Sequence, residues 1–271
     1  YFLGTLNYYF RNQPALAIRS YVKAFELDSQ SVAIPVEAVI LLLDLGDVAS
    51  AERWVELAER NSGGDYLGKS ARFSLALYQR DEVSAEAISR EMAETAQPIS
   101  TGFHYMGDLP WLRQLHAADP QLAMEAYMRL APELLEEEPR VGAWNHAAAI
   151  SLADWMRRSG DAAAANSLLE KSLSVISQTT DRYYPPARAT AYLLQGDTHR
   201  ALAALREAAE GGWRVGWWRL EREPIYEPLW ELPEFQSLMA EVRADMATQL
   251  ERVREMEERG ELVLIPELVA E

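Results

Sequence analysis

The stretch LGDVASAERWVELAER (residues 45–60) decides the fold, because the same pattern occurs on both sides of it. RNQPALAIRSYVKAFELD (residues 11–28) comes before it, and QRDEVSAEAISREMAE (residues 79–94) follows it. In the aligned stretches Ala17, Ala51 and Ala85 occupy the same position, and both steps between them are 34 residues. Two equal steps of this length indicate a repeated supersecondary unit.

The pattern returns three more times, with the equivalent alanine at Ala123, Ala165 and Ala201. These steps are 38, 42 and 36 residues, so insertions loosen the period in the middle of the chain. Good helix formers dominate the composition, and only the short run near Val263 has a strand-like pattern. We therefore expect an all-α chain.

A short turn precedes each of these alanines. Five positions before them stand Asn12, Gly46, Arg80, Ala118, Gly160 and Gly196, followed by Gln13, Asp47, Asp81, Asp119, Asp161 and Asp197. Gly and Asn accept the left-handed conformation that ends a helix, and Asp caps the next helix. Each repeat is predicted to be helix, turn, helix, with the small alanine where the two helices cross.

The fourth repeat departs from the others. Asp108-Leu109-Pro110 interrupts its first helix, because proline lacks the N–H donor and crowds the preceding turn. We expect a short helix over residues 111–117 and a repeat array over residues 1–209.

The C-terminal part begins with GWRVGWWRLEREP (residues 212–224) and continues into an apolar stripe on one helix, residues 233–259. A solenoid must close its last apolar face, so residues 210–260 are predicted to be a tryptophan-rich turn and a capping helix. The cap residues are Trp213, Trp217, Trp218 and Phe235. Ligand contact by the tryptophans is the alternative, and of the adjacent Trp217 and Trp218 at most one is expected to point inward.

The apolar tail, residues 261–271, and the methionine-rich stripe of the long helix each allow two interpretations. Either they pack on their own domain, or they pair two chains into a homodimer. The tail also has the character of a segment that enters a neighbouring groove.

A 34-residue helix–turn–helix repeat with Gly-Asp turns and an alanine anchor resembles the tetratricopeptide repeat (TPR) family. The order GWR, WW, EP, PEFQ and then an amphipathic helix resembles the C-terminal TPR region of bacterial CadC-type membrane-tethered transcriptional regulators and class III adenylate or guanylate cyclases. The resemblance implies a right-handed α-solenoid of about six helix pairs. It also implies a regulatory part of a larger bacterial signalling protein, soluble and either periplasmic or cytoplasmic.

Composition excludes several function classes. The chain of 271 residues carries 42 acidic and 26 basic side chains, a net charge of −16, which disfavours direct binding of nucleic acid. It has no cysteine, its four histidines lack metal-ligand spacing, and no catalytic motif is visible. No apolar run approaches the roughly 20 residues that span a bilayer. We therefore expect no catalytic residues, no metal and no cofactor.

With catalysis, metal binding and nucleic-acid binding set aside, the resemblance to TPR domains predicts binding in a concave groove. In such arrays the first helix of each pair lines the concave face, and the matching positions here are Tyr9, Asp44, Ser74, Tyr78, His116, Asp154, Arg157 and Arg158. Arg157 and Arg158 are suited to bind a carboxylate of a partner. The predicted function is a non-catalytic module that binds a protein or peptide. A homo-oligomerising scaffold is the alternative, and a small-molecule sensor or enzyme is a weaker one.

Overall fold

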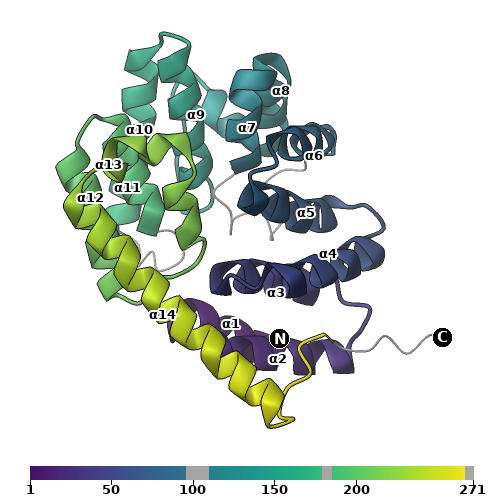
Figure 1. The fold of residues 1–271 in the computed structure, drawn as a ribbon. Coiled ribbons are helices and arrows are strands. Elements are labelled where there is room, and N and C mark those ends of the chain that lie inside the picture. The colour runs from purple at the N-terminus through teal and green to yellow at the C-terminus, as the bar shows by residue number, and fades with distance from the viewer. Residues whose placement is uncertain (96–109, 179–184, 266–271) are drawn as a thin grey trace. The chain divides into compact units, whose positions relative to one another are not determined.

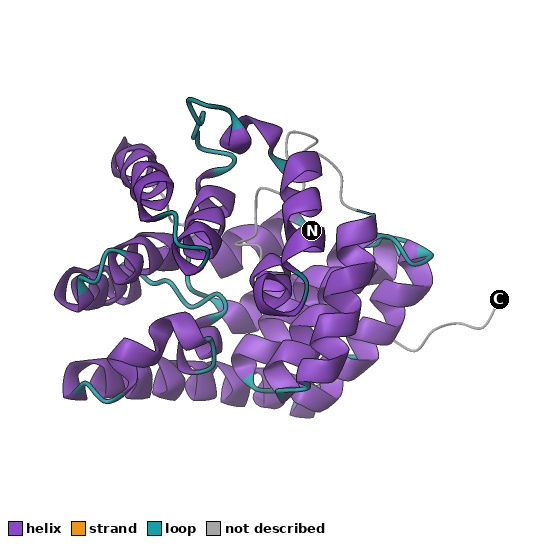
Figure 2. Cartoon of the chain, turned by 90° about the horizontal axis from the view of Figure 1, so that it is seen from above, coloured by secondary structure: helices purple, strands orange, loops and turns teal. Residues whose placement is uncertain are grey.

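The computed structural model describes residues 1–95, 110–178 and 185–265. Every regular element in these ranges is a helix, as Figure 2 shows, and the short run near Val263 is not a strand. The all-α prediction is confirmed, and the packing of consecutive helices is consistent with an α-solenoid.

Six helix pairs follow the predicted repeats (Figure 1). They are α1 (Phe2–Thr5) continued by the π-helical η1 (Leu6–Phe10) with α2 (Pro14–Leu27), α3 (Ala33–Leu45) with α4 (Val48–Ser62), α5 (Tyr66–Gln79) with α6 (Glu82–Glu94), α7 (Pro110–Ala118) with α8 (Pro120–Leu130), α9 (His146–Arg158) with α10 (Ala162–Gln178), and α11 (Pro185–Leu194) with α12 (Thr198–Glu210).

The turn chemistry read from the sequence is confirmed. All six anchor alanines are at most 1% exposed, as expected where two helices cross. Five of the six residues before the turns have positive φ, and among them Asn12 and Arg80 are non-glycine. Asp47, Asp119, Asp161 and Asp197 each accept a backbone N–H three residues ahead. The period therefore comes from a repeated local device.

The fourth repeat has the short first helix that was predicted. α7 is nine residues long and begins at Pro110, where the missing N–H of proline costs no helical hydrogen bond. Asp108 and Leu109 lie outside the described residues.

The chain forms two compact units that cut across the predicted ranges 1–209, 210–260 and 261–271. Unit 1 holds residues Tyr1–Glu82, Gly212–Arg222 and Pro233–Glu271. Unit 2 holds Val83–Gly211 and Glu223–Leu232. Each is described by itself below.

In unit 1 the long C-terminal helix α14 (Pro233–Glu258) lies against α2 and α3, far from it in sequence (Figure 1). Of the seven residues in its apolar stripe, six are buried: Leu238, Met239, Val242, Met246, Val253 and Met256. The seventh, Leu250, is half-buried, and Gln249 is buried beside it. The sequence pattern assigned this helix to the last repeat, but here it covers the second helix of the first pair and the first helix of the second. The reason is that α3 is buried almost all round and needs apolar neighbours on every side.

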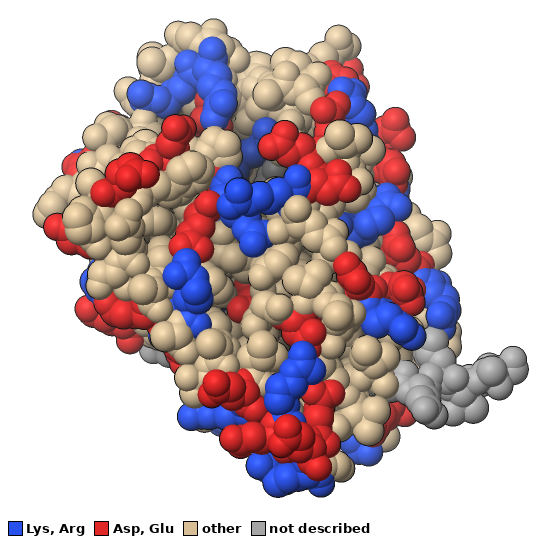
Figure 3. All heavy atoms as spheres, viewed as in Figure 1, with Lys and Arg blue, Asp and Glu red and all other residues tan. Residues whose placement is uncertain are grey.

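The solvent face of α14 is charged. Near its C-terminal end Arg254 pairs with Glu257 and Arg259 pairs with Glu255, and Figure 3 shows acidic and basic side chains intermixed along that edge. Exposed pairs of this kind contribute little stability, but they keep one face of the helix polar.

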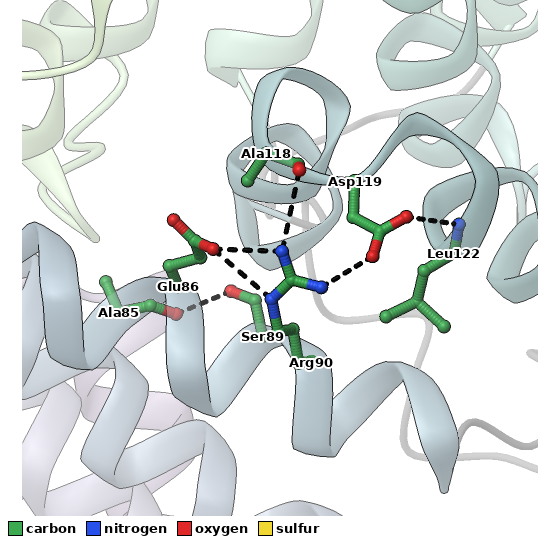
Figure 4. A network of polar contacts seen from close by, with 7 residues as sticks. All are labelled: Ala85, Glu86, Ser89, Arg90, Ala118, Asp119 and Leu122. Carbon is green, nitrogen blue, oxygen red and sulfur yellow. Dashed lines mark hydrogen bonds and ion pairs between the residues drawn. The ribbon is translucent and has the colours of Figure 1, made fainter.

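Unit 2 contains the later repeats together with two short elements, η6 (Pro224–Tyr226) and α13 (Glu227–Trp230). A polar network joins α6 to the turn between α7 and α8 (Figure 4). Arg90 on α6 bonds Glu86 on its own helix and reaches Asp119 at 2.5 Å, while Asp119 caps α8 through the Leu122 N–H. The hydrogen bond from the Leu122 N–H lowers the pKa of Asp119 most, and the hydrogen bond from Arg90 lowers it further. The network fixes α6 against the turn between α7 and α8.

Candidate functional site

Asp44, a predicted groove residue at the C-terminal end of α3, is the centre of a buried polar cluster in unit 1. It is 0% exposed and accepts the Gly216 N–H at 3.0 Å from each carboxylate oxygen, as well as the Tyr8 hydroxyl. The indole Nε1 of Trp217 donates to the Asp44 backbone carbonyl at 2.9 Å. One residue thus anchors the tryptophan segment (Gly212–Arg222) to the second repeat.

The tryptophan segment turns at Gly216, which has a φ of 67°, and then forms the 3₁₀ helix η5 (Trp217–Glu221). Both Trp217 and Trp218 are buried, at 8% and 5% exposure, so the expectation that at most one points inward is wrong. The tight 3₁₀ turn sends one indole to the end of α3 and the other against the Tyr78 ring of α5, edge-on at 4.9 Å. The two indole rings are therefore buried against α3 and α5, the first helices of two neighbouring repeats.

The other predicted cap residues, Trp213 and Phe235, are also buried, at 6% and 2% exposure. The described part of the tail packs inward as well, since the Trp54 indole donates to the Leu264 carbonyl at 3.0 Å. The predicted cap thus contributes to the core of unit 1, next to the first three repeats.

A second buried carboxylate, Glu37 on α3, was not among the predicted residues. It accepts the Tyr9 hydroxyl at 3.0 Å and the Tyr21 hydroxyl at 3.3 Å. Burial raises the pKa of Glu37 to about 7, and burial likewise raises the pKa of Asp44 to about 7, against the opposing hydrogen bonds. The one sequence signal for Glu37 was its position in the apolar run AIPVEAVILLLDL, because a buried carboxylate there must find a hydrogen-bond donor.

In unit 2 the first helices α7 and α9 bring three predicted residues together: His116, Asp154 and Arg158. The Arg158 Nε donates to both oxygens of Asp154, at 3.0 and 3.1 Å, while the His116 Nδ1 lies 4.0 Å from the same carboxylate. The His116 Nε2 meets the Tyr127 hydroxyl at 3.1 Å. Asp154 is 6% exposed, but the Arg158 side chain is 57% exposed. A buried carboxylate therefore holds a solvent-facing guanidinium.

His116 is a neutral member of this cluster. Burial, then the charges of Arg113 and Arg158, lower its pKa to about 3. The 4.0 Å approach to Asp154 is therefore a contact between a neutral ring and a carboxylate, and it is too long for a hydrogen bond. With its side chain 2% exposed, His116 packs inside unit 2, where its hydrogen bond is to Tyr127.

Next to it lies a buried ion pair that sequence reasoning missed. Arg113 on α7 meets Glu223 at 2.5 Å, with side-chain exposures of 12% and 8%, and donates to the Ser151 hydroxyl at 3.2 Å. Glu223 was read only as part of the EP turn, because nothing in the sequence links it to a helix 110 residues away.

The remaining predicted residues do not join these clusters. The Ser74 hydroxyl bonds back to the Ser70 carbonyl on its own helix, and the exposed Arg157 makes a long 3.5 Å contact with Asn166. The eight residues thus divide between the two units, and the strongest grouping is His116, Asp154 and Arg158.

Within the described ranges no group of three or more His, Cys, Asp or Glu side chains is arranged to hold a metal ion. In the same part of the chain, no helix combines the length and the apolar character that crossing a membrane requires. Comparison of the chain with protein-family models, curated proteins and solved structures finds no match. The resemblance to TPR domains stays a hypothesis.

Proposed function

We propose that this chain is a non-catalytic binding module, a right-handed TPR-like α-solenoid whose first helices take a protein or peptide partner. The observation that carries the proposal is the way the Arg158 guanidinium is held. Its Nε is fixed by Asp154, and among the described residues its two Nη groups make no hydrogen bond. A guanidinium held in this way loses little side-chain entropy on binding and presents two donors to a partner carboxylate.

The role in a larger protein rests on the resemblance alone. By analogy with CadC-type regulators and class III cyclases, the module would control an output domain by binding its partner. Such analogy concerns architecture, whereas the partner is set by side chains such as Arg158.

Calorimetric titration of the full chain with acidic and neutral peptides of equal length tests the proposal. Arg158→Ala is expected to weaken binding of the acidic peptides, and Asp154→Asn to weaken it less, because the guanidinium remains but is no longer held. Arg53→Ala is the charge-matched control, since Arg53 lies exposed on the second helix α4. Equal affinities for Arg158→Ala and Arg53→Ala would remove the groove assignment.

A homo-oligomerising scaffold is the second candidate, favoured by one apolar face. Phe2 and Leu3 on α1 are 83% and 57% exposed, and Leu6 and Phe10 continue the same face. Large apolar side chains gathered in this way mark interaction surfaces. Light scattering at increasing concentration decides: a monomer throughout excludes the scaffold, whereas a dimer that Phe2→Ser and Leu3→Ser abolish supports it.

A further inference from the structure

Arg222, the last residue of the tryptophan segment, lies on an aromatic platform in unit 1. Its guanidinium carbon is 4.1 Å from the centre of the Tyr78 ring and 5.1 Å from that of Trp218. The two rings meet edge to face at 4.9 Å, so they form a corner that holds the guanidinium in one orientation. Stacking of this kind suits arginine and leaves the edge of the guanidinium for hydrogen bonds.

The charge on Arg222 has no carboxylate partner. Neither Arg222 nor Arg80 forms an ion pair in the described part of the chain, and the adjacent Glu221 is bonded to Arg243. Burial, then the positive charge of Arg80, lowers the pKa of Arg222, while Tyr78 and Glu221 act in the opposite direction. Two cations thus stand together without a counter-charge.

This arrangement is unusual for this chain, whose net charge is −16. Other half-buried or buried arginines in it, such as Arg113 and Arg214, meet a carboxylate at 2.5 and 2.7 Å. The Nη1 of Arg222 is instead buried and has no hydrogen-bond acceptor. The buried Nη1 itself is closed to a ligand, so a partner anion would meet the other N–H groups of the guanidinium and compensate the charge there.

We infer that Arg222 and Arg80, on the Tyr78–Trp218 platform, form a binding subsite for a carboxylate of an acidic peptide segment. The planar guanidinium matches a carboxylate in a two-bond fork, and the exposed Arg80 adds a second positive charge near it. A singly charged carboxylate also enters the field of an acidic chain at lower electrostatic cost than a phosphate dianion. The inference rests on the proposed function, because it names a chemical feature of the bound peptide.

The test uses the full chain and a fluorescein-labelled peptide of six glutamates, followed by fluorescence anisotropy. Arg222→Gln is expected to weaken binding about tenfold, the loss of one charge-assisted hydrogen-bonded contact. Arg222→Lys should weaken it as well, because an ammonium keeps the charge but loses the fork. Arg53→Gln, which removes an equal charge from the exposed face of α4, should leave the affinity unchanged.

A second readout locates the peptide. The indole N–H signal of Trp218 in a nitrogen-15 NMR spectrum, assigned with Trp218→Phe, should shift on addition of the peptide and should not shift in Arg222→Gln. Circular dichroism checks that each variant folds. If Arg222→Gln does not fold, Arg222→Lys alone decides the test. Inorganic phosphate at matched ionic strength should displace the peptide no better than acetate does.

The outcomes separate this inference from the proposed function. If Arg158→Ala abolishes binding of the peptide while Arg222→Gln and Arg222→Lys leave it intact, the binding module stands and the subsite is wrong. If none of the three changes the affinity, both are wrong. Displacement by phosphate at concentrations where acetate has no effect overturns the carboxylate assignment.

Discussion

Replacing Asp44 with Asn tests the link between the tryptophan segment and the repeats. The amide has the same shape as the carboxyl group and its oxygen still accepts the Gly216 N–H, but its NH₂ group cannot accept the second contact from that N–H and must donate to the Tyr8 hydroxyl oxygen. What changes is that position 44 no longer titrates. The lost contact lowers stability equally at every pH, so the pH dependence of the difference between variant and wild type isolates the charge.

The magnitude follows from the pKa of Asp44, which burial raises from 3.8 to about 7. A carboxyl whose pKa is higher in the folded state than in the unfolded chain stabilises the fold fully below about pH 4. That contribution is lost as the pH rises through about 7. The change from 3.8 to about 7 corresponds to a loss on the order of 4 kcal/mol in the free energy of unfolding. The difference in stability between the wild-type chain and Asp44→Asn should shift by this amount, in favour of the variant, between pH 4 and pH 8.

Urea denaturation followed by tryptophan fluorescence, at intervals from pH 4 to pH 8, measures this shift. Comparison with the variant cancels the titration of the other carboxylates, and Glu37→Gln serves as a parallel case, since the pKa of Glu37 is raised from 4.5 to about 7. Parallel stability curves for the wild type and Asp44→Asn would refute the reasoning, because Asp44 would then be as easily ionised in the folded state as in the unfolded one.

Three further predictions follow from single contacts. Asp47→Ala should cost about 2 kcal/mol, since it removes both the cap of α4 and the partner of Arg254, whereas Asp65→Ala, an exposed cap of α5, should cost about 1 kcal/mol; chemical denaturation compares them. Arg113→Ala should cost about 3 kcal/mol because it removes the ion-pair partner of the buried Glu223 carboxylate, and Arg113→Ala combined with Glu223→Gln should recover part of that loss in a double-mutant cycle. Trp54→Phe keeps a ring beside Phe25 but removes the hydrogen bond to Leu264, so limited proteolysis should cleave the chain near Leu264 faster, and the smaller ring in a fully buried site should also lower global stability by about 1–2 kcal/mol.

The repeats could be predicted because their signals are local. The small residue at each helix crossing, the left-handed position before the turn and the Asp cap all lie within six residues of one another. Even the exceptions conform, since Arg80 adopts a φ of 60° where the repeat requires a left-handed residue. A pattern of this kind fixes helix pairs without knowledge of any distant contact.

The clusters could not be predicted, because their members are far apart in the sequence. Position in the repeat placed His116, Asp154 and Arg158 on successive first helices, which is why they were found together. It carried no information about Arg222, Glu223 or Gly216, which lie beyond the repeats and reach their partners only after the chain has folded back.

That return of the chain changes how unit 1 holds together. In a simple solenoid each repeat contacts only its neighbours, so removal of one end leaves the other end intact. Here α14 covers α2 and α3, and Gly216 and Trp217 satisfy the end of α3. Without residues 212–265, Asp44 would keep only Tyr8 as a hydrogen-bond partner among those described, and the apolar faces of α2 and α3 would be exposed. The first repeats of this chain therefore depend on its last helix, and their stability is not a sum over neighbouring repeats.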